Sequence, residues 1–251
     1  MIIPNIWPGK TVVILAGGPS LRTQNLSRLT LATQRDTKLL AVNDSWRLLQ
    51  DLRIATSRPF KCQQCDGSGG APNNLCSMCD GVGMLSSCVS YFCDSKWWQQ
   101  SMAANKRTLD NTYSFHDAIY KLWWFTGSPD FAGHPQVHSV RLTGQLGLEV
   151  APSGLRHGSN AGYQAINLAV HFGAKKIVLL GYDMRMQEGR THWHNEPRPD
   201  GFADVLAQSM LPHFATLVEP LEQLGIEVIN ATPDSALECF PKMSLEDALT
   251  S

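Results

Sequence analysis

Two cysteine pairs, each followed by glycines at the same spacing, form the clearest chemical pattern in the chain. Cys62-Gln-Gln-Cys65-Asp-Gly-Ser-Gly and Cys76-Ser-Met-Cys79-Asp-Gly-Val-Gly both fit C-x-x-C-x-G-x-G. Each C-x-x-C turn places two thiolates on one side of a tight loop, and two such turns supply the tetrahedral sulfur set that Zn²⁺ prefers. We therefore predict a structural zinc ion on Cys62, Cys65, Cys76 and Cys79, with a disulfide pair or a redox site as the alternative.

A pair of histidines offers the chemistry that a closed zinc site cannot supply. Four thiolates leave zinc no open coordination position, so catalysis must lie elsewhere. His192 and His194 are two residues apart in a polar loop, and side chains at this spacing point the same way on an extended segment. We expect them to act in acid–base catalysis or substrate binding, on a lid that the ligand orders. Trp193 between them is either a stacking wall or a packing aromatic.

Two loop-to-helix junctions are suited to binding phosphate. The turn Gly17-Gly18-Pro19-Ser20 follows an apolar run, and N–H groups at a helix start attract anions. We expect a side chain at Gly18 to block phosphate with a modest loss of stability. The second junction carries Arg156, which could neutralise a phosphate, and Ser159 and Asn160, which could hydrogen-bond it. An ordinary connecting turn and an ordinary N-cap are the alternatives.

The elements that position these residues alternate between strands and helices. Helical spacing predicts helices at 159–172 and around 211–224, and apolar runs predict strands at 11–16, 38–43, 87–93, 137–142, 176–181 and 226–230. This order predicts an α/β fold, a Rossmann-like three-layer domain with a parallel sheet. We assign residues 1–57 and 86–251 to that domain, and residues 58–85 to a small zinc unit inserted between two of its strands.

Polar residues follow several of the predicted strands. They are Asn43 and Asp44 after the second strand, Asp94 after the third, and Tyr182 and Asp183 after the strand at 176–181. Ligands of open parallel sheets bind beyond the carboxyl ends of the strands. We therefore expect one shared site that includes these residues and the glycine turn.

The composition limits the classes of partner. The chain has 251 residues, 43% of them hydrophobic, and a formal net charge of −1, so no overall basic field draws it to nucleic acid or membrane. The N-terminus lacks the pattern of a signal peptide, and no uninterrupted apolar run reaches membrane-spanning length. We expect a cytoplasmic protein, with Cys88, Cys93 and Cys239 as small hydrophobic residues outside any disulfide framework.

Several short motifs in a fixed order resemble a known superfamily. They are Ala16-Gly-Gly-Pro-Ser-Leu21, Ala41-Val-Asn43-Asp, Tyr91-Phe-Cys-Asp94, Gly158-Ser-Asn-Ala-Gly162, Ala174-Lys-Lys-Ile-Val-Leu-Leu-Gly-Tyr-Asp183 and the tail from Glu227 to Pro241. Together they resemble the superfamily that joins bacterial lipooligosaccharide sialyltransferases with a domain of 6-hydroxymethylpterin pyrophosphokinases and flagellin-modification factors. Small phage-encoded members look closest, which implies the host cytoplasm as location. Residues 58–85 are absent from that pattern; their cysteine motifs resemble the zinc knuckles of J-protein chaperones.

The resemblance implies a nucleotide-binding transferase. The residues that match its nucleotide-contacting positions are Gly18, Ser20, Asn43, Ser159 and Asn160, and Asp94 falls where a donor- or acceptor-contacting residue is expected. The phosphate-binding tyrosines of the sialyltransferases are not matched, because this loop carries His192 and His194. A sialyltransferase-like base near the later helix has one counterpart, His213.

Three functions follow from these observations. The leading one is a metal-independent glycosyltransferase-like enzyme that uses a nucleotide-sugar and a histidine base. The second is an ATP-dependent phosphoryl or pyrophosphoryl transferase, which needs Mg²⁺ on carboxylates such as Asp44, Asp94 and Asp183. The third is a non-catalytic protein that senses or sequesters a nucleotide. The acceptor stays open among a glycan, a small molecule and a modified nucleic acid, as does homo-oligomerisation.

Overall fold

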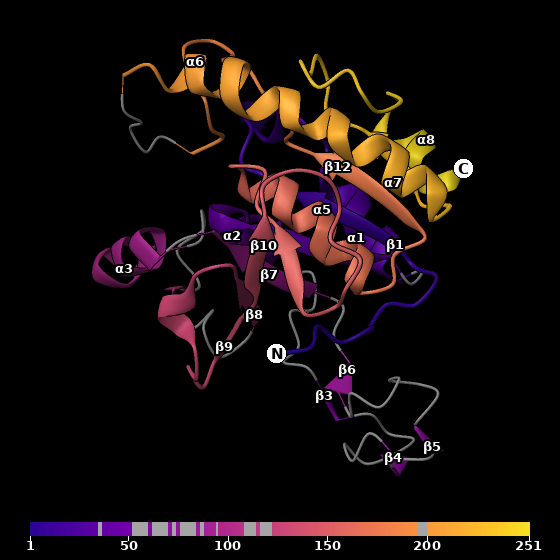
Figure 1. The fold of residues 1–251 in the computed structure, drawn as a ribbon. Coiled ribbons are helices and arrows are strands. Elements are labelled where there is room, and N and C mark those ends of the chain that lie inside the picture. The colour runs from indigo at the N-terminus through magenta and orange to yellow at the C-terminus, as the bar shows by residue number, and fades with distance from the viewer. Residues whose placement is uncertain are drawn as a thin grey trace.

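A computed structural model describes most of the chain (Figure 1). The described residues are 1–34, 37–51, 60–61, 70–71, 74–75, 84–85, 88–93, 95–107, 114–115, 122–194 and 200–251. Asp94 and the four cysteines of the predicted zinc site lie outside them.

A parallel sheet of seven strands forms the centre of the molecule. Its order is β13-β12-β1-β2-β7-β8-β9, and every neighbouring pair is parallel. The strands are β1 Thr11–Leu15, β2 Lys38–Val42, β7 Cys88–Phe92, β8 Trp123–Thr126, β9 Val137–Ser139, β12 Lys176–Leu180 and β13 Glu227–Asn230. The central strands are buried, as their apolar runs predict for a sheet covered on both faces.

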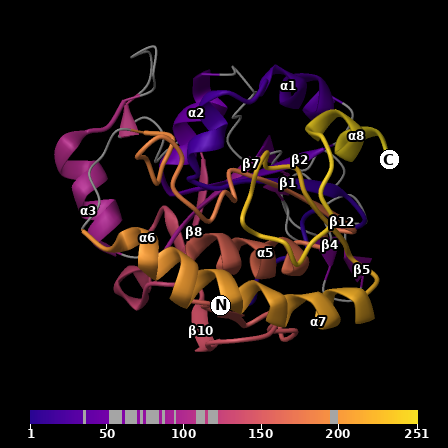
Figure 2. The same cartoon turned by 90° about the horizontal axis from the view of Figure 1, so that it is seen from above.

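Helices cover both faces of this sheet and bury two separate hydrophobic clusters, as Figure 2 shows from above. One face carries α5 Ala161–His171 and a long helical segment composed of α6 Phe202–Val205, a π-helical turn Leu206–Met210, a 3₁₀ stretch Leu211–Leu217 and α7 Val218–Gln223. The other carries the 3₁₀ turn η1 Pro19–Arg22, α1 Ser27–Gln34, η2 Asn43–Ser45, α2 Trp46–Asp51, α3 Ser95–Ala104, η3 Pro129–Phe131 and α8 Leu245–Thr250. The predicted Rossmann-like α/β architecture is therefore confirmed.

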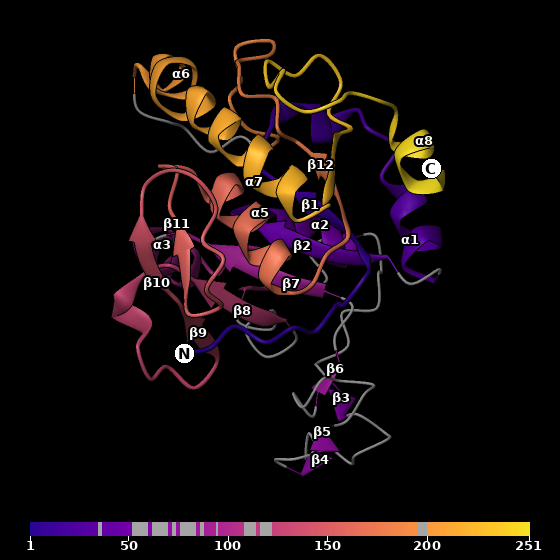
Figure 3. The ribbon, with the colours of Figure 1, turned by 45° about the vertical axis from the view of Figure 1, so that its right-hand side comes forward.

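The fold differs from the sequence-based expectation at three places. The strand expected at 137–142 is two strands, β9 and β10 Arg141–Gly144, and β10 pairs with β11 Gly154–Arg156 outside the main sheet (Figure 3). Strand β8 was not expected. The last long helix begins at Phe202 and not near 211. Pro212 disturbs the helical pattern in the sequence and the regular hydrogen bonding, but it does not end the helix.

The segment that holds the cysteine motifs lies between β2 and β7, which are neighbours in the sheet. Four two-residue strands are described in it: β3 Phe60–Lys61, β4 Gly70–Ala71, β5 Asn74–Leu75 and β6 Met84–Leu85. Strand β3 pairs antiparallel with β6, and β4 with β5. Each cysteine motif is thus preceded and followed by a short strand, in the same arrangement twice. The division into a main domain and an inserted unit stays a prediction.

The connections after β1 and β12 leave the sheet toward opposite faces. The first helical turn after β1 lies on the face of α1, whereas the first helical segment after β12, from α6 to α7, lies on the other face. A crevice at the carboxyl edge between such strands is the common ligand position in parallel sheets. Within the described residues, no helix is long and apolar enough to cross a bilayer.

We expect purified protein to contain about one zinc ion per chain, held by Cys62, Cys65, Cys76 and Cys79. Cys62→Ser should lower the zinc content but leave the circular dichroism of the α/β domain in place, because the paired strands β2 and β7 close the sheet without this segment. Cys239→Ser, in the half-buried C-terminal tail, is the matched control and should keep its zinc. Protein without zinc whose four thiols form disulfides would contradict the assignment.

Candidate functional site

A buried hydrogen-bonded lock closes the crevice between β1 and β12. The Ser20 amide donates to Asp183 Oδ1 at 3.0 Å, and the Ser20 hydroxyl donates to Asp183 Oδ2 at 2.8 Å. The Gly18 amide donates to the Gly181 carbonyl at 2.8 Å. The carboxylate of Asp183 thus occupies the place at the start of η1 where a phosphate would bind. Burial raises the pKa of Asp183, and the two bonds from Ser20 lower it in part.

Gly18 belongs to the fold as well as to the candidate site. A Cβ atom at this position would lie 1.8 Å from Asp183 Oδ2 and 2.4 Å from the Gly181 carbonyl oxygen. A side chain there must break the lock, so the expectation of a modest loss of stability for Gly18→Val is wrong. Pro19, the first residue of η1, is buried beside it.

Gly17 supports the histidine loop. A Cβ atom on Gly17 would lie 2.8 Å from His192 Cδ2, so the imidazole packs directly on this glycine. The Trp193 amide donates to the Gly17 carbonyl at 3.0 Å. The loop after β12 therefore folds back over the turn after β1, as its position after a buried strand predicts.

Trp193 anchors that loop in the protein core. Its side chain is buried, its Nε1 donates to Ser45 Oγ at 3.3 Å, and the guanidinium of Arg47 lies 5.3 Å from its ring centroid. Arg22 donates to the Trp193 carbonyl at 3.4 Å. Trp193 is thus a packing aromatic and not a stacking wall, and the expected ligand-ordered lid is held at this residue without a ligand.

Asp44 is the centre of a buried polar cluster at the end of β2. Lys106 Nζ lies 3.0 and 3.2 Å from its two oxygens, Trp97 Nε1 donates to Oδ2 at 2.9 Å, and His194 Nε2 lies 3.7 Å from Oδ2. Burial alone would raise the pKa of Asp44, but Lys106, His194 and Trp97 hold it below its ordinary value. Lys106 and Trp97 were missed by sequence reasoning, because only the fold brings them to this carboxylate.

The two histidines lie between the buried Asp44 and the protein surface. His194 is buried beside Asp44, whereas His192 is half-buried, and their ring centroids are 5.2 Å apart. Asn43 lies at the same edge as Gly17. Leu15 pairs with Ala41 in the sheet, and Gly17 and Asn43 each follow two residues later. The φ of 49° at Asn43 is unusual for a residue other than glycine, and its amide oxygen is buried without a hydrogen-bond partner.

At the second predicted phosphate junction, Asn160 caps the helix and Ser159 does not. Asn160 Oδ1 accepts the amides of Gly162 and Tyr163 at 2.7 and 3.2 Å and so caps α5, while Ser159 is exposed with φ 56°. Arg156 lies 3.4 Å from the Glu149 carboxylate, beside the middle of α5. Arg156 therefore already has an acidic partner away from the start of the helix.

His213 belongs to the junction before α5 and not to the histidine loop. Its Nδ1 lies 2.9 Å from the Gly158 carbonyl oxygen. His192 packs at the start of the helical segment that contains His213, with its ring 5.6 Å from that of Phe202. Eleven residues separate Phe202 from His213, which is roughly 16 Å along a helix. His192 and His213 therefore lie beside different parts of this helical segment.

The described residues contain no group of three or more His, Cys, Asp or Glu side chains that could hold a metal ion. The proposed zinc ligands and Asp94 lie outside those residues, so their roles stay predictions.

Comparison with known proteins points to one fold. No family model and no curated protein matches the sequence. Among solved structures, the chain is similar to the MAf glycosyltransferase from Magnetospirillum magneticum AMB-1, with 11% identity and a TM-score of 0.52. The similarity covers 97% of this chain but only 35% of that one, so this chain spans about a third of its length. At this identity the comparison shows a shared α/β fold.

The two neighbouring glycines should respond differently to alanine. Gly18→Ala forces a methyl group into the lock and should lower the free energy of unfolding by about 1–3 kcal/mol or more. Gly17→Ala meets only the movable end of His192, so the protein should keep its melting temperature while the His192 imidazole NMR signals shift. Equal melting temperatures for the two variants would show that the Ser20–Asp183 lock does not constrain the fold.

Lys106→Met should destabilise the protein in a pH-dependent way. Removing one partner of a buried ion pair costs about 3–5 kcal/mol. In the wild type the pKa of Asp44 is depressed, so its contribution is present above the unfolded-state pKa and is lost as the pH falls through the folded-state pKa. Without Lys106, burial dominates and raises the pKa of Asp44. The difference in stability between wild type and variant should then be largest near neutral pH and shrink on acidification.

Asp44→Asn provides the control for this measurement. In the Asp44→Asn background, Lys106→Met should no longer produce a pH-dependent difference, since the carboxylate is gone. A difference that is the same at every pH would mean that Lys106 stabilises the protein by packing alone.

Proposed function

We propose that the protein is a nucleotide-sugar-dependent, glycosyltransferase-like enzyme with a histidine base. The observation that carries this proposal is the row Asp44–His194–His192, which runs from a buried carboxylate to the half-buried imidazole on Gly17 at the carboxyl edge of the sheet. The fold shared with a glycosyltransferase supports the reaction class. Fold alone does not determine chemistry, so the histidine arrangement is the stronger support.

In the proposed reaction an acceptor hydroxyl attacks the anomeric carbon of the donor sugar. The new carbon–oxygen bond forms as the bond from that carbon to the phosphate oxygen breaks, and the hydroxyl proton passes to a ring nitrogen of His192. His192 is the outer of the two rings and the one that a substrate can reach first. His194 lies between His192 and Asp44. The negative charge of Asp44 favours the positive charge that the two histidines gain when His192 accepts the proton.

The donor nucleotide would lie between the glycine turn and the start of α5. Gly17 and the exposed hydroxyl of Ser159 are suited to contact it, with Asn43 at the same edge as Gly17 and His213 beside the loop of Ser159. Gly18, Ser20 and Asp183 would shape this site through the lock, since their polar groups already bond one another. Zinc is proposed as a structural ion in 58–85.

A phosphoryl or pyrophosphoryl transfer is the second candidate, and the carboxylates argue against it. Mg²⁺ would need oxygen ligands from residues such as Asp44 and Asp183. Both are engaged, Asp44 by Lys106 and Trp97 and Asp183 by Ser20, so a divalent ion would have to displace buried partners. The histidine mechanism needs no such rearrangement.

Alanine substitution of the histidines tests the mechanism. With a nucleotide-sugar that stabilises the protein in a thermal-shift panel, His192→Ala should lower turnover by about 10²–10⁴-fold, the usual contribution of a general base. His194→Ala should lower kcat less and change its pH profile, because it acts through His192. His213→Ala should raise KM for the donor and leave kcat near the wild-type value.

Asp44→Asn, which removes the carboxylate and keeps the shape, should reproduce the effect of His194→Ala. A loss of turnover in His213→Ala alone would move the base to the start of α5. Full activity in all three histidine variants would exclude a histidine base.

A further inference from the structure

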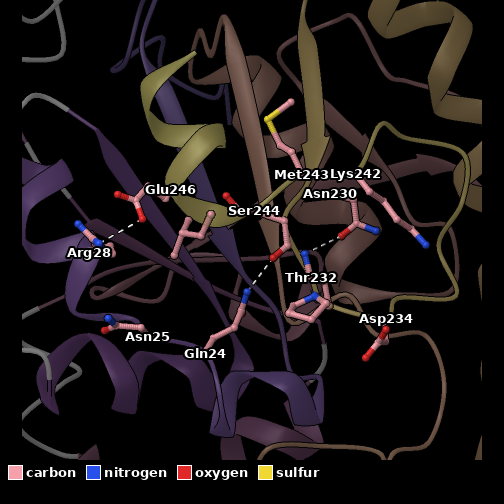
Figure 4. Close-up of a pocket in the computed structure, with 13 residues that line it drawn as sticks. Gln24, Asn25, Arg28, Asn230, Thr232, Asp234, Lys242, Met243, Ser244 and Glu246 are labelled. Atoms are coloured by element: carbon pink, nitrogen blue, oxygen red, sulfur yellow. Dashed lines mark hydrogen bonds and ion pairs between the residues drawn. The ribbon is translucent and has the colours of Figure 1, made fainter.

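A pocket of about 520 Å³ opens beside the carboxyl end of β13 (Figure 4). Its walls come from three distant parts of the chain: residues 24–28, residues 230–234 and residues 242–246. This volume is within the usual range for small-molecule sites.

The walls of the pocket are tied to one another. Gln24 Nε2 donates to the Ala231 carbonyl at 2.7 Å, and the Asn230 amide donates to the Pro241 carbonyl at 2.8 Å. Arg28 and Glu246 form an ion pair at 3.1 Å, which joins residues 24–28 to residues 242–246. Because each wall is bonded to the next, the pocket exists without a ligand, and a ligand would not have to order it.

The lining combines apolar surface with charged groups that are balanced in number. Its two basic residues, Arg28 and Lys242, are matched by two acidic ones, Asp234 and Glu246. Such a lining suits neither a phosphate, which needs an excess of positive charge, nor a divalent cation, which needs clustered carboxylates. A ligand that fits is uncharged and offers both hydrogen-bond donors and acceptors.

Apolar and planar polar groups lie together in the same pocket. Pro233, Met243 and Leu245 supply apolar surface, and Asn25 adds a side-chain amide, while the amide of Gln24 is already bonded to Ala231. Hydroxyl groups on a ring with apolar C–H faces match this combination, since hydroxyls both donate and accept and the C–H groups gain from burial. A saccharide has this chemistry.

The pocket also borders the proposed catalytic edge. The Tyr182 amide donates to Thr232 Oγ1 at 3.0 Å, and Ser235 Oγ donates to the Tyr182 carbonyl at 2.5 Å, so the pocket wall is bonded to the segment that carries Asp183. Strand β13 is two strands from β1, or roughly 10 Å. A short oligosaccharide held here can extend over η1 toward His192.

We infer that this pocket binds a neutral saccharide, the acceptor of the proposed transfer. The role of the saccharide as acceptor rests on the proposed function. Binding of the saccharide to the pocket can be measured without a donor and without turnover.

Saturation-transfer NMR on the full chain tests the inference with glucose, galactose, N-acetylglucosamine and lactose as probes, and with uridine and glucose 6-phosphate as comparison ligands. At least one neutral sugar should receive saturation. Arg28→Met and Asp234→Gly should weaken its binding about tenfold each, the effect of one lost hydrogen bond to a charged group. Glycine tolerates the φ of 51° at Asp234, and Arg28 is in an exposed ion pair, so both variants should fold.

Glu222→Gln, an exposed change on α7 outside the pocket, should bind the sugar as the wild type does. The inference is overturned if no neutral sugar binds, if both pocket variants bind it like the wild type, or if uridine or glucose 6-phosphate displaces it from the pocket.

The same experiment separates this inference from the proposed function. His192→Ala should still bind the sugar, because His192 does not line the pocket. Sugar binding that depends on Arg28 and Asp234, in a protein inactive with every donor, would leave the pocket in place and remove the proposed reaction. If Arg28→Met and Asp234→Gly both turn over substrate at the wild-type rate, the proposed reaction stands and the pocket is not its acceptor site.

Discussion

The lock between Ser20 and Asp183 is the constraint on which the arrangement of the carboxyl edge depends. It joins the turn after β1 to the turn after β12, two neighbouring strands whose following helices lie on opposite faces of the sheet. Hydrogen bonds to a buried carboxylate contribute about 1.5–3 kcal/mol each, so two of them fix this junction firmly. Gly17, η1 and the Tyr182 amide that bonds to Thr232 in the pocket wall all adjoin this junction.

The fold could be predicted from the sequence wherever an element buries a long apolar run. Residues 176–180 are apolar after Lys176 and bounded by Gly181, and the strand there begins and ends close to the predicted limits. Prediction failed where a short element depends on its neighbours. Strand β8 has four residues and pairs with β7 and β9. The Val140 amide still bonds to the Thr126 carbonyl of β8, and β10 then leaves the main sheet to pair with β11. Neither pairing has a local sequence signal.

For the site, sequence reasoning located the edge but not the partners within it. The glycine turn, Asp44 and the histidine loop were expected at one edge, and the structure brings them together, because the ends of parallel strands must meet there. The ion pair of Asp44 with Lys106 spans 62 positions and depends on where α3 ends. A periodicity or motif cannot reveal such a pair. The burial of Trp193 is a similar case, since a tryptophan in a polar loop gives no indication of the core that receives it.

Anchoring of the histidine loop has a consequence for how a ligand can be bound. Trp193 is held by Ser45, Arg22 and Arg47, and His194 lies against Asp44, so the loop is positioned before any substrate arrives. Preorganised groups stabilise a transition state without the cost of being ordered during the reaction. Because the inner side of the loop is filled by these contacts, a ligand has to approach the outer side of His192. Asn43 and the start of α5 lie at this same edge, and in the proposed function the donor would lie beside them.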